Sequence, residues 1–179
     1  VLETFLDIRE IENTRRLLQE SEVRYKAIFM NTGTPGILIN EDTSIAVANT
    51  EFLNLVGITE KDMRQAPSWT RYFHPDDTQR MLNYHVLRRK DEKSAPRSYE
   101  ARLMDSSGEA HYVRLTVAVI PNSQQSIAFL LDISDIKNAE RKLQELAYTD
   151  ALTGLPNRLC AMERLHKTLQ GLSPENSSL

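Results

Sequence analysis

The spacing of apolar residues shifts along the chain from a helical period to a strand period and back again. Apolar residues at alternating steps of three and four predict helices over residues 9–30 and 135–149. Between them, short apolar runs bounded by turn residues predict strands. The five predicted strands span 36–40, 44–48, 97–104, 110–120 and 126–133. This order of elements predicts an α+β domain with a five-stranded antiparallel sheet and helices on one face.

Helix signals fill the interval between the second and third predicted strands. Asn49 begins a short amphipathic helix that Gly57 ends, and Thr59 is placed to cap the turn that follows. The segment His-Pro-Asp-Asp at 74–77 opens a longer helix, because proline suits a first turn and acidic side chains complement the helix dipole there.

The chain repeats itself near its two ends. Residues 6–20 and 131–145 are related by an offset of 125 positions, which is the length of a whole domain rather than of a solenoid unit. The residues that recur identically are Leu6, Asp7, Ile8, Ile11, Asn13, Arg16, Leu18, Gln19 and Glu20. Because the second copy follows a predicted strand, we expect residues 1–8 to be the last strand of a preceding domain in a longer array.

Each repeated segment places apolar residues along one side of a helix. The first seam consists of Ile11, Thr14, Leu18, Ser21, Tyr25 and Ile28, and the second of Ile136, Ala139, Leu143 and Leu146. Such a seam is typical of a short parallel coiled coil, and equally of an amphipathic helix that packs on its own domain. With an apolar outer sheet face at Tyr112, Ala118 and Ile120, the first interpretation predicts a homodimer.

Composition and charge exclude several classes of function. The 179 residues include 22 Lys and Arg and 25 Asp and Glu, so the net charge is −3. This charge lacks the positive excess that is typical of proteins that bind nucleic acid or anionic membranes. No apolar run reaches the roughly 20 residues of a membrane span. The first residues do not form a signal peptide, and Cys160 is alone, so neither a disulfide nor a cysteine zinc cluster is expected. We therefore expect a soluble, cytoplasmic chain.

Residues 22–134 resemble a PAS domain. The matching residues are Glu22, Tyr25 and Ile28-Phe29; Asn49, Phe52 and Leu55-Val56-Gly57; His74-Pro75-Asp76-Asp77; Glu100-Ala101-Arg102-Leu103 before Gly108; and Asp132-Ile133-Ser134. Ser107 stands where the family prefers Asp, and Tyr112 where it often has Trp. The resemblance implies a PAS fold flanked by N- and C-terminal signalling helices and a role in sensing or relaying signals.

Residues 150–179 are similar to the start of a GGDEF domain, the diguanylate cyclase of bacterial cyclic di-GMP signalling. The resemblance rests on the string DALTGLPNR at 150–158. It implies that Asp150 and Arg158 fix the turn after the linker helix at 135–149. The metal-binding carboxylates and GG(D/E)EF loop of that family do not occur in this sequence, so we expect no catalysis by the chain itself. The parent protein is then a cyclase, active or degenerate, or a hybrid that also degrades the product.

The PAS resemblance places a cavity between helices and sheet. The predicted wall residues are Ile37, Ile39, Val47, Phe52, Tyr72, Leu82, His85, Tyr99, Leu103 and Val113. These residues can bind an unknown small molecule, or they can simply fill the core. Trp69 and Tyr72 are interpreted as packing residues around the cavity.

No cofactor is expected in this cavity. Haem-binding relatives take their iron ligand from the long helix, but about one turn before His85, so the residues favour a haem-free domain over the alternative of a haem sensor. A flavin–cysteinyl sensor needs a cysteine after the Asn49 helix, where none occurs. His74 and His111 lack partners at metal-ligand spacing, so no metal is expected, and the basic run 88–90 is interpreted as a solvated helix end.

Two functions remain open for the chain: a ligand-sensing regulatory module, or a ligand-free dimerisation relay. In either case, the signal is expected to pass through the exit of the sheet and the linker helix. The predicted relay residues are Asp132, Ser134, Ile136, Leu143, Leu146, Asp150 and Arg158.

Overall fold

The structure, a computed structural model, describes residues 2–65, 67–148, 157 and 162. It consists of two units, 1–133 and 134–179, which are described separately here. In the described part of the chain, no helix combines the length and the apolar character needed to span a membrane.

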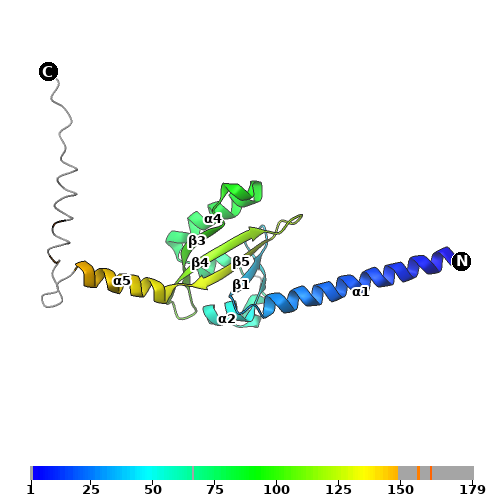
Figure 1. Cartoon of the computed structure of the whole chain (residues 1–179), viewed down its shortest axis with the longest axis horizontal. Coiled ribbons are helices and arrows are strands. Elements are labelled where there is room, and N and C mark those ends of the chain that lie inside the picture. The colour runs from blue at the N-terminus through cyan, green and yellow to red at the C-terminus, as the bar shows by residue number, and fades with distance from the viewer. Residues whose placement is uncertain (1, 66, 149–156, 158–161, 163–179) are drawn as a thin grey trace, which may run out of the picture. The chain divides into compact units, whose positions relative to one another are not determined.

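The first unit is built on one five-stranded antiparallel sheet (Figure 1). Its strands are β1 (Gly36–Ile39), β2 (Ile45–Ala48), β3 (Ser98–Met104), β4 (Ala110–Val119) and β5 (Ser126–Asp132). Their spatial order is β2-β1-β5-β4-β3. The predicted strands and their antiparallel pairing are confirmed, with bounds that agree to within one residue.

The register of the sheet places alternate apolar residues on the helix-covered face. Ala101 pairs with Val113, and Leu115 pairs with Leu130, and all four side chains are buried. A slip of one residue would turn these side chains to the other face, so burial fixes the register. Phe52 and Val56 pack against this face, and both are almost fully buried.

Three α-helices lie where the sequence predicts them, and two 3₁₀ helices were not predicted. They are α2 (Thr50–Val56), α3 (Glu60–Met63), the 3₁₀ helix η1 (Trp69–Tyr72), α4 (Pro75–Lys90) and the 3₁₀ helix η2 (Glu92–Ser94). Gly57 ends α2 with a φ of 72°, and a Cβ at this position would lie 2.6 Å from the Ser106 hydroxyl oxygen. The positive φ favours glycine here, and a larger residue would also displace the Ser106 side chain.

Helix α1 (Leu2–Met30) corrects one prediction from the sequence repeat. Residues 2–8 are helical, although their counterparts in the second copy end strand β5. The difference has a physical cause: Leu131 and Asp132 pair with β4, whereas the described chain offers residues 2–8 no neighbouring strand. A helix satisfies its own backbone hydrogen bonds without such a neighbour. In the second unit, the predicted linker helix is present as α5 (Ser134–Tyr148).

Asn49 joins the end of α1 to the sheet and to α2. Its side chain is fully buried, and its Oδ1 accepts hydrogen bonds from the backbone N–H of Gly36 at 2.8 Å and of Phe52 at 3.0 Å. Its Nδ2 donates to the carbonyl oxygens of Phe29 at 3.2 Å and Thr34 at 2.8 Å. One amide group therefore caps α2, starts β1 and holds the last turn of α1.

Replacing this amide should destabilise the whole first unit. In Asn49→Ala, two buried N–H groups and two carbonyls lose their partner, so we expect the free energy of unfolding to fall by about 2–4 kcal/mol. Urea denaturation followed by circular dichroism measures the change. Asn54→Ala, at an exposed position on the same helix, is the matched control and should change the value by less than about 0.5 kcal/mol. Equal stability of the two variants would contradict this role for Asn49.

Candidate functional site

A small cavity lies between α4, η1 and the sheet. Its volume is about 20 Å³, roughly the room that one water molecule needs. It is lined by Ile37, Ile39, Trp69, Phe73, Met81, His85, Arg88, Tyr99, Leu115, Val117 and Ala128. Cavities that hold drug-sized ligands measure about 300–1,000 Å³, so the side chains of this core fill most of the available space.

The structure brings together only some of the predicted wall residues. Ile37, Ile39, His85 and Tyr99 line the cavity. Four others are buried in the core without lining it: Phe52, Tyr72, Leu103 and Val113. Leu82 packs at the edge of the core, and Val47 is half-buried outside the lining. The interpretation of Trp69 and Tyr72 as packing residues is confirmed.

Arg88 was wrongly assigned to a solvated helix end. Its side chain is only 4% exposed and donates a hydrogen bond to the Pro96 carbonyl oxygen at 2.6 Å. Met81, His85 and Arg88 follow one another at helical spacing along α4, so all three lie on the same buried face. This periodicity in the sequence would have identified Met81 and Arg88 as cavity residues.

His85 is held by the backbone. Its Nε2 lies 3.0 Å from the Glu41 carbonyl oxygen, and its ring centroid lies 5.9 Å from that of Trp69. Burial lowers the pKa of His85 below its ordinary value. The imidazole therefore serves as a neutral hydrogen-bonding group that joins α4 to the turn after β1.

Two further polar groups meet the cavity lining. Burial raises the pKa of Tyr99 above its ordinary value, although the positive charge of Arg88 acts in the opposite direction. The Trp69 Nε1 is buried, and no hydrogen-bond acceptor lies within reach among the described residues. The cavity is thus mainly apolar with a few polar groups, and its volume suits one water molecule.

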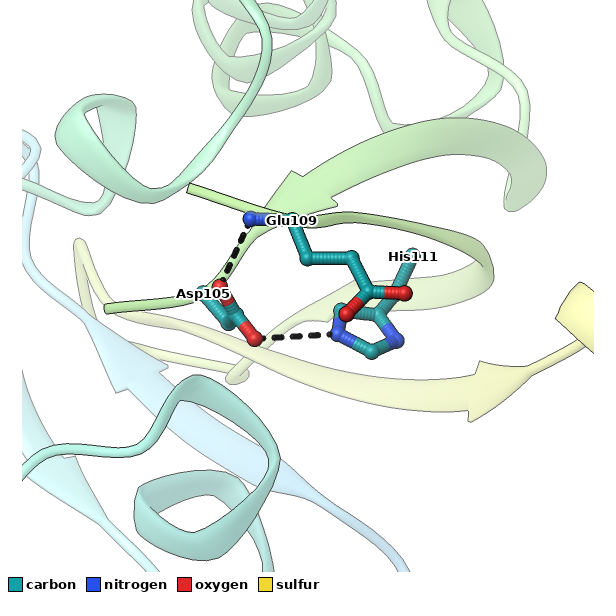
Figure 2. A group of neighbouring side chains, drawn as sticks. All are labelled: Asp105, Glu109 and His111. Carbon is teal, nitrogen blue, oxygen red and sulfur yellow. Dashed lines mark hydrogen bonds and ion pairs between the residues drawn. The ribbon is translucent and has the colours of Figure 1, made fainter. Parts of the chain in front are cut away.

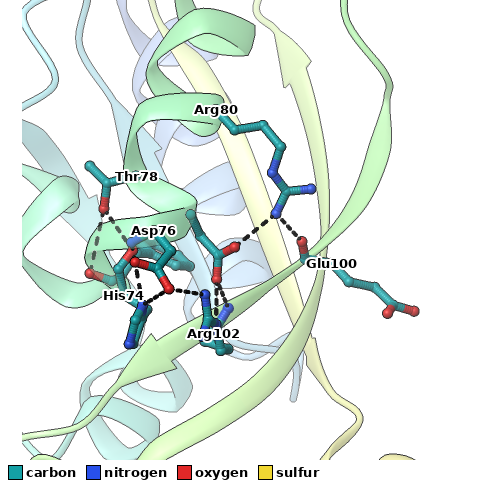
Figure 3. Close-up of polar contacts among 8 residues, drawn as sticks. His74, Asp76, Thr78, Arg80, Glu100 and Arg102 are labelled. Carbon is teal, nitrogen blue, oxygen red and sulfur yellow. Dashed lines mark hydrogen bonds and ion pairs between the residues drawn. The ribbon is translucent and has the colours of Figure 1, made fainter.

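A polar network fixes the start of α4 on strand β3 (Figure 3). The Arg102 backbone N–H and Nε donate to Asp77 Oδ2 at 3.0 and 2.9 Å, and Arg80 donates to Asp77 Oδ1 at 3.1 Å. Partial burial alone would raise the pKa of the Asp77 carboxyl, but the hydrogen bonds from Arg102 outweigh this and lower it. His74 caps the helix by accepting from the Asp76 N–H. The network holds α4 over the cavity.

The hairpin between β3 and β4 contains a cluster that the sequence interpretation missed (Figure 2). His111 Nε2 lies 3.3 Å from Asp105 Oδ2, and Glu109 lies beside both. The prediction that His111 lacks a partner is therefore wrong. Sequence spacing alone does not show which residues an antiparallel register brings together across a turn.

Asp105 organises this turn. Its Oδ1 accepts hydrogen bonds from the Ser107 N–H at 2.9 Å, the Ser107 hydroxyl at 2.7 Å and the Glu109 N–H at 2.8 Å. The hydroxyl hydrogen bond is the largest cause, and the Glu109 N–H the next, of a pKa for the Asp105 carboxyl of about 2. The carboxylate is therefore ionised throughout the neutral range.

The predicted relay residues lie in different parts of the chain. Asp132 ends β5, with its Oδ2 3.7 Å from His111 Nδ1, and Ser134 begins α5. On α5, three apolar relay side chains are more than half exposed: Ile136, Leu143 and Leu146. Asp150 and Arg158 lie outside the described residues. Whether these positions carry a signal stays a prediction.

Comparison with known proteins identifies the fold. Residues 45–131 match the PAS_3 family, described as a PAS fold. The PAS domain of an HTR-like protein from Haloarcula marismortui superposes with a TM-score of 0.53 at 19% identity, covering 68% of this chain and 99% of that one. A sensory box histidine kinase/response regulator from Burkholderia thailandensis E264 gives 0.52 at 17% identity, covering 80% and 98%.

Among characterised sequences, the sensor histidine kinase TmoS of Ectopseudomonas mendocina is 23% identical over 140 residues. The match covers 76% of this chain but only 14% of the kinase, so the chain spans about one-seventh of that relative. With the sheet order and the helix-covered face, the family match over residues 45–131 and the superposed structures show that this part of the chain has a PAS fold.

The turn geometry makes a prediction about Asp105. The folded pKa of about 2 lies below the ordinary value of 3.8. Asp105 therefore stabilises the fold at pH values above about 4, and this contribution is lost as the pH falls through about 2. Carboxyl-carbon NMR titration should give a midpoint near 2 for Asp105, and Ser107→Ala should move it toward 3.8.

The control is Ser98→Ala, at an exposed position in β3, which should leave the Asp105 midpoint unchanged. An ordinary midpoint in the unmodified protein would show that the turn does not hold the carboxylate in this way.

Proposed function

We propose that this chain is the sensory and regulatory PAS part of a diguanylate cyclase, and that it relays a signal through its flanking helices to a GGDEF domain. The observation that carries the relay is the exposure of the apolar seam on α1. Ile11, Leu18 and Tyr25 are each more than 60% exposed, so this seam is not used for packing on the chain's own sheet. The downstream GGDEF domain is supported by the sequence at 150–158. In this proposal, the module works in the cytoplasm.

An exposed apolar seam is costly in water and favours a partner of the same kind. A parallel homodimer would pair the α1 seams of two copies, and the α5 seams likewise. Full burial of a seam leucine contributes on the order of 2 kcal/mol. Because short helices are marginal alone, a small change at the sensory core can shift how the α5 seams meet. Such a shift would change the spacing of two cyclase domains.

The dimer is tested by sedimentation of the purified chain at micromolar concentration. We expect a dimer, and we expect Leu18→Asp to raise its dissociation constant at least tenfold, because a charge replaces a buried leucine on each copy. Leu143→Asp should act in the same direction. Gln19→Asp, an exposed position beside the seam, is the matched control and should have little effect. A monomeric unmodified chain, or equal effects of Leu18→Asp and Gln19→Asp, would contradict the dimer.

The cavity favours a ligand-free relay over a ligand sensor. Its volume of about 20 Å³ leaves no room for a haem, a flavin or a metabolite unless side chains move. The Nε2 of His85, the atom that would bind a haem iron, already contacts the Glu41 carbonyl oxygen. The runner-up function, ligand sensing at this cavity, would use Arg88, Tyr99 and the free Trp69 N–H as its polar contacts.

These alternatives separate when the purified protein is unfolded and the released material is analysed. We expect no small molecule by mass spectrometry and no visible absorption band before unfolding. Repeated release of one stoichiometric compound would establish the ligand sensor. A Soret band that disappears in His85→Ala would establish a haem sensor instead.

The cyclase assignment is tested on the longer protein that contains this chain. We expect it to convert GTP to cyclic di-GMP, and Leu143→Asp to change the rate severalfold while Gln144→Asp does not. Absence of any conversion by a folded, dimeric protein would contradict an active cyclase.

A further inference from the structure

The β3–β4 hairpin gathers one imidazole and two carboxylates within reach of a single ion. The candidate ligand atoms of Asp105, Glu109 and His111 all lie within 4.8 Å of one another. Figure 2 shows the Glu109 carboxylate beside the His111 ring, with Asp105 reaching the same ring from the opposite strand. The cluster is separate from the core cavity, none of whose lining residues it shares.

Asp105 Oδ2 and His111 Nε2 are already as far apart as two ligands of one tetrahedral metal ion. Zinc binds histidine nitrogen and carboxylate oxygen at about 2.0–2.1 Å, so two such ligands at a tetrahedral angle lie about 3.3–3.4 Å apart. The distance from Asp105 Oδ2 to His111 Nε2 is 3.3 Å. An ion can therefore replace the proton between these atoms without movement of the backbone.

Hydrogen bonds within the turn hold the Asp105 carboxylate in an orientation that suits metal binding. Its Oδ1 receives all three hydrogen bonds from Ser107 and Glu109, so its Oδ2 is left directed at the imidazole. The Glu109 side chain is exposed, and its flexible stem can adjust to complete the site.

His111 also has a second carboxylate on its far nitrogen. Asp132 Oδ2 lies 3.7 Å from His111 Nδ1, on the side away from Asp105. Histidines that bind metals usually donate their other N–H to such a carboxylate, which orients the ring and raises its basicity. At 3.7 Å, Asp132 is within ion-pair distance of this nitrogen but not within hydrogen-bond distance, so a small side-chain movement would be needed for it to orient the ring.

We propose that Asp105, Glu109 and His111 bind a divalent transition-metal ion of the zinc class, with water as the fourth ligand. The imidazole nitrogen favours zinc over magnesium or calcium, which take oxygen ligands. Asp132 is the last residue of β5 and directly precedes the stretch where the chain leaves the sheet. A bound ion would therefore brace the exit of the sheet. The site does not depend on the cyclase assignment.

Isothermal titration calorimetry of the 179-residue protein with ZnCl₂, in a buffer without chelators, tests this site. We expect one ion per chain at micromolar affinity, and no saturable heat with MgCl₂. His111→Gln and Glu109→Gln should each weaken binding at least tenfold. Because Glu109 is exposed, its variant keeps the test valid even if His111→Gln perturbs folding, which circular dichroism would show.

Glu92→Gln, an exposed acidic position in η2, is the matched control and should bind zinc as the unmodified protein does. Cys160→Ser/His166→Gln removes the other strong zinc donors of the C-terminal segment and should also leave binding unchanged. The proposal is overturned if no 1:1 binding is found, or if binding survives Glu109→Gln and is lost in Cys160→Ser/His166→Gln.

Discussion

The first unit depends on the hydrogen bonds of one buried amide, that of Asn49. This amide forms hydrogen bonds with three separate elements: the last turn of α1, the first residue of β1 and the first turn of α2. A buried amide group with all its hydrogen bonds made is directional, so it fixes how these elements meet, whereas the surrounding apolar packing only requires that they touch. The Phe29 ring adds an apolar contact beside this junction, with its centroid 6.1 Å from that of Phe129 on β5.

Apolar side chains fill the core of the first unit but lie exposed along helix α1. The core face of the sheet is filled by its own side chains and leaves about 20 Å³. The seam of α1, in contrast, is exposed from Ile11 to Ile28. In the proposed function, the helices rather than the cavity make the contacts that transmit the signal.

Much of the fold could be predicted from the sequence, because strand alternation and helix caps act locally. The strand bounds, the Asn49 and Gly57 helix ends and the start of α4 all follow from such signals. The site could be predicted only in part. Arg88 was missed because a basic run resembles a solvated helix end, and the Asp105–His111 contact because it depends on hairpin register. Residues 2–8 repeat a strand sequence, but no strand among the described residues pairs with them, and they are helical.

The central claim is that the end of α1, the sheet and α2 open and close as one unit around Asn49. Native-state hydrogen exchange of the Gly36 and Phe52 amides, which both donate to Asn49 Oδ1, tests it most directly. The account predicts that both amides exchange only by global unfolding, with an opening free energy equal to that of the β4 and β5 amides. Exchange of either amide through a local opening several kcal/mol below the global value would contradict it.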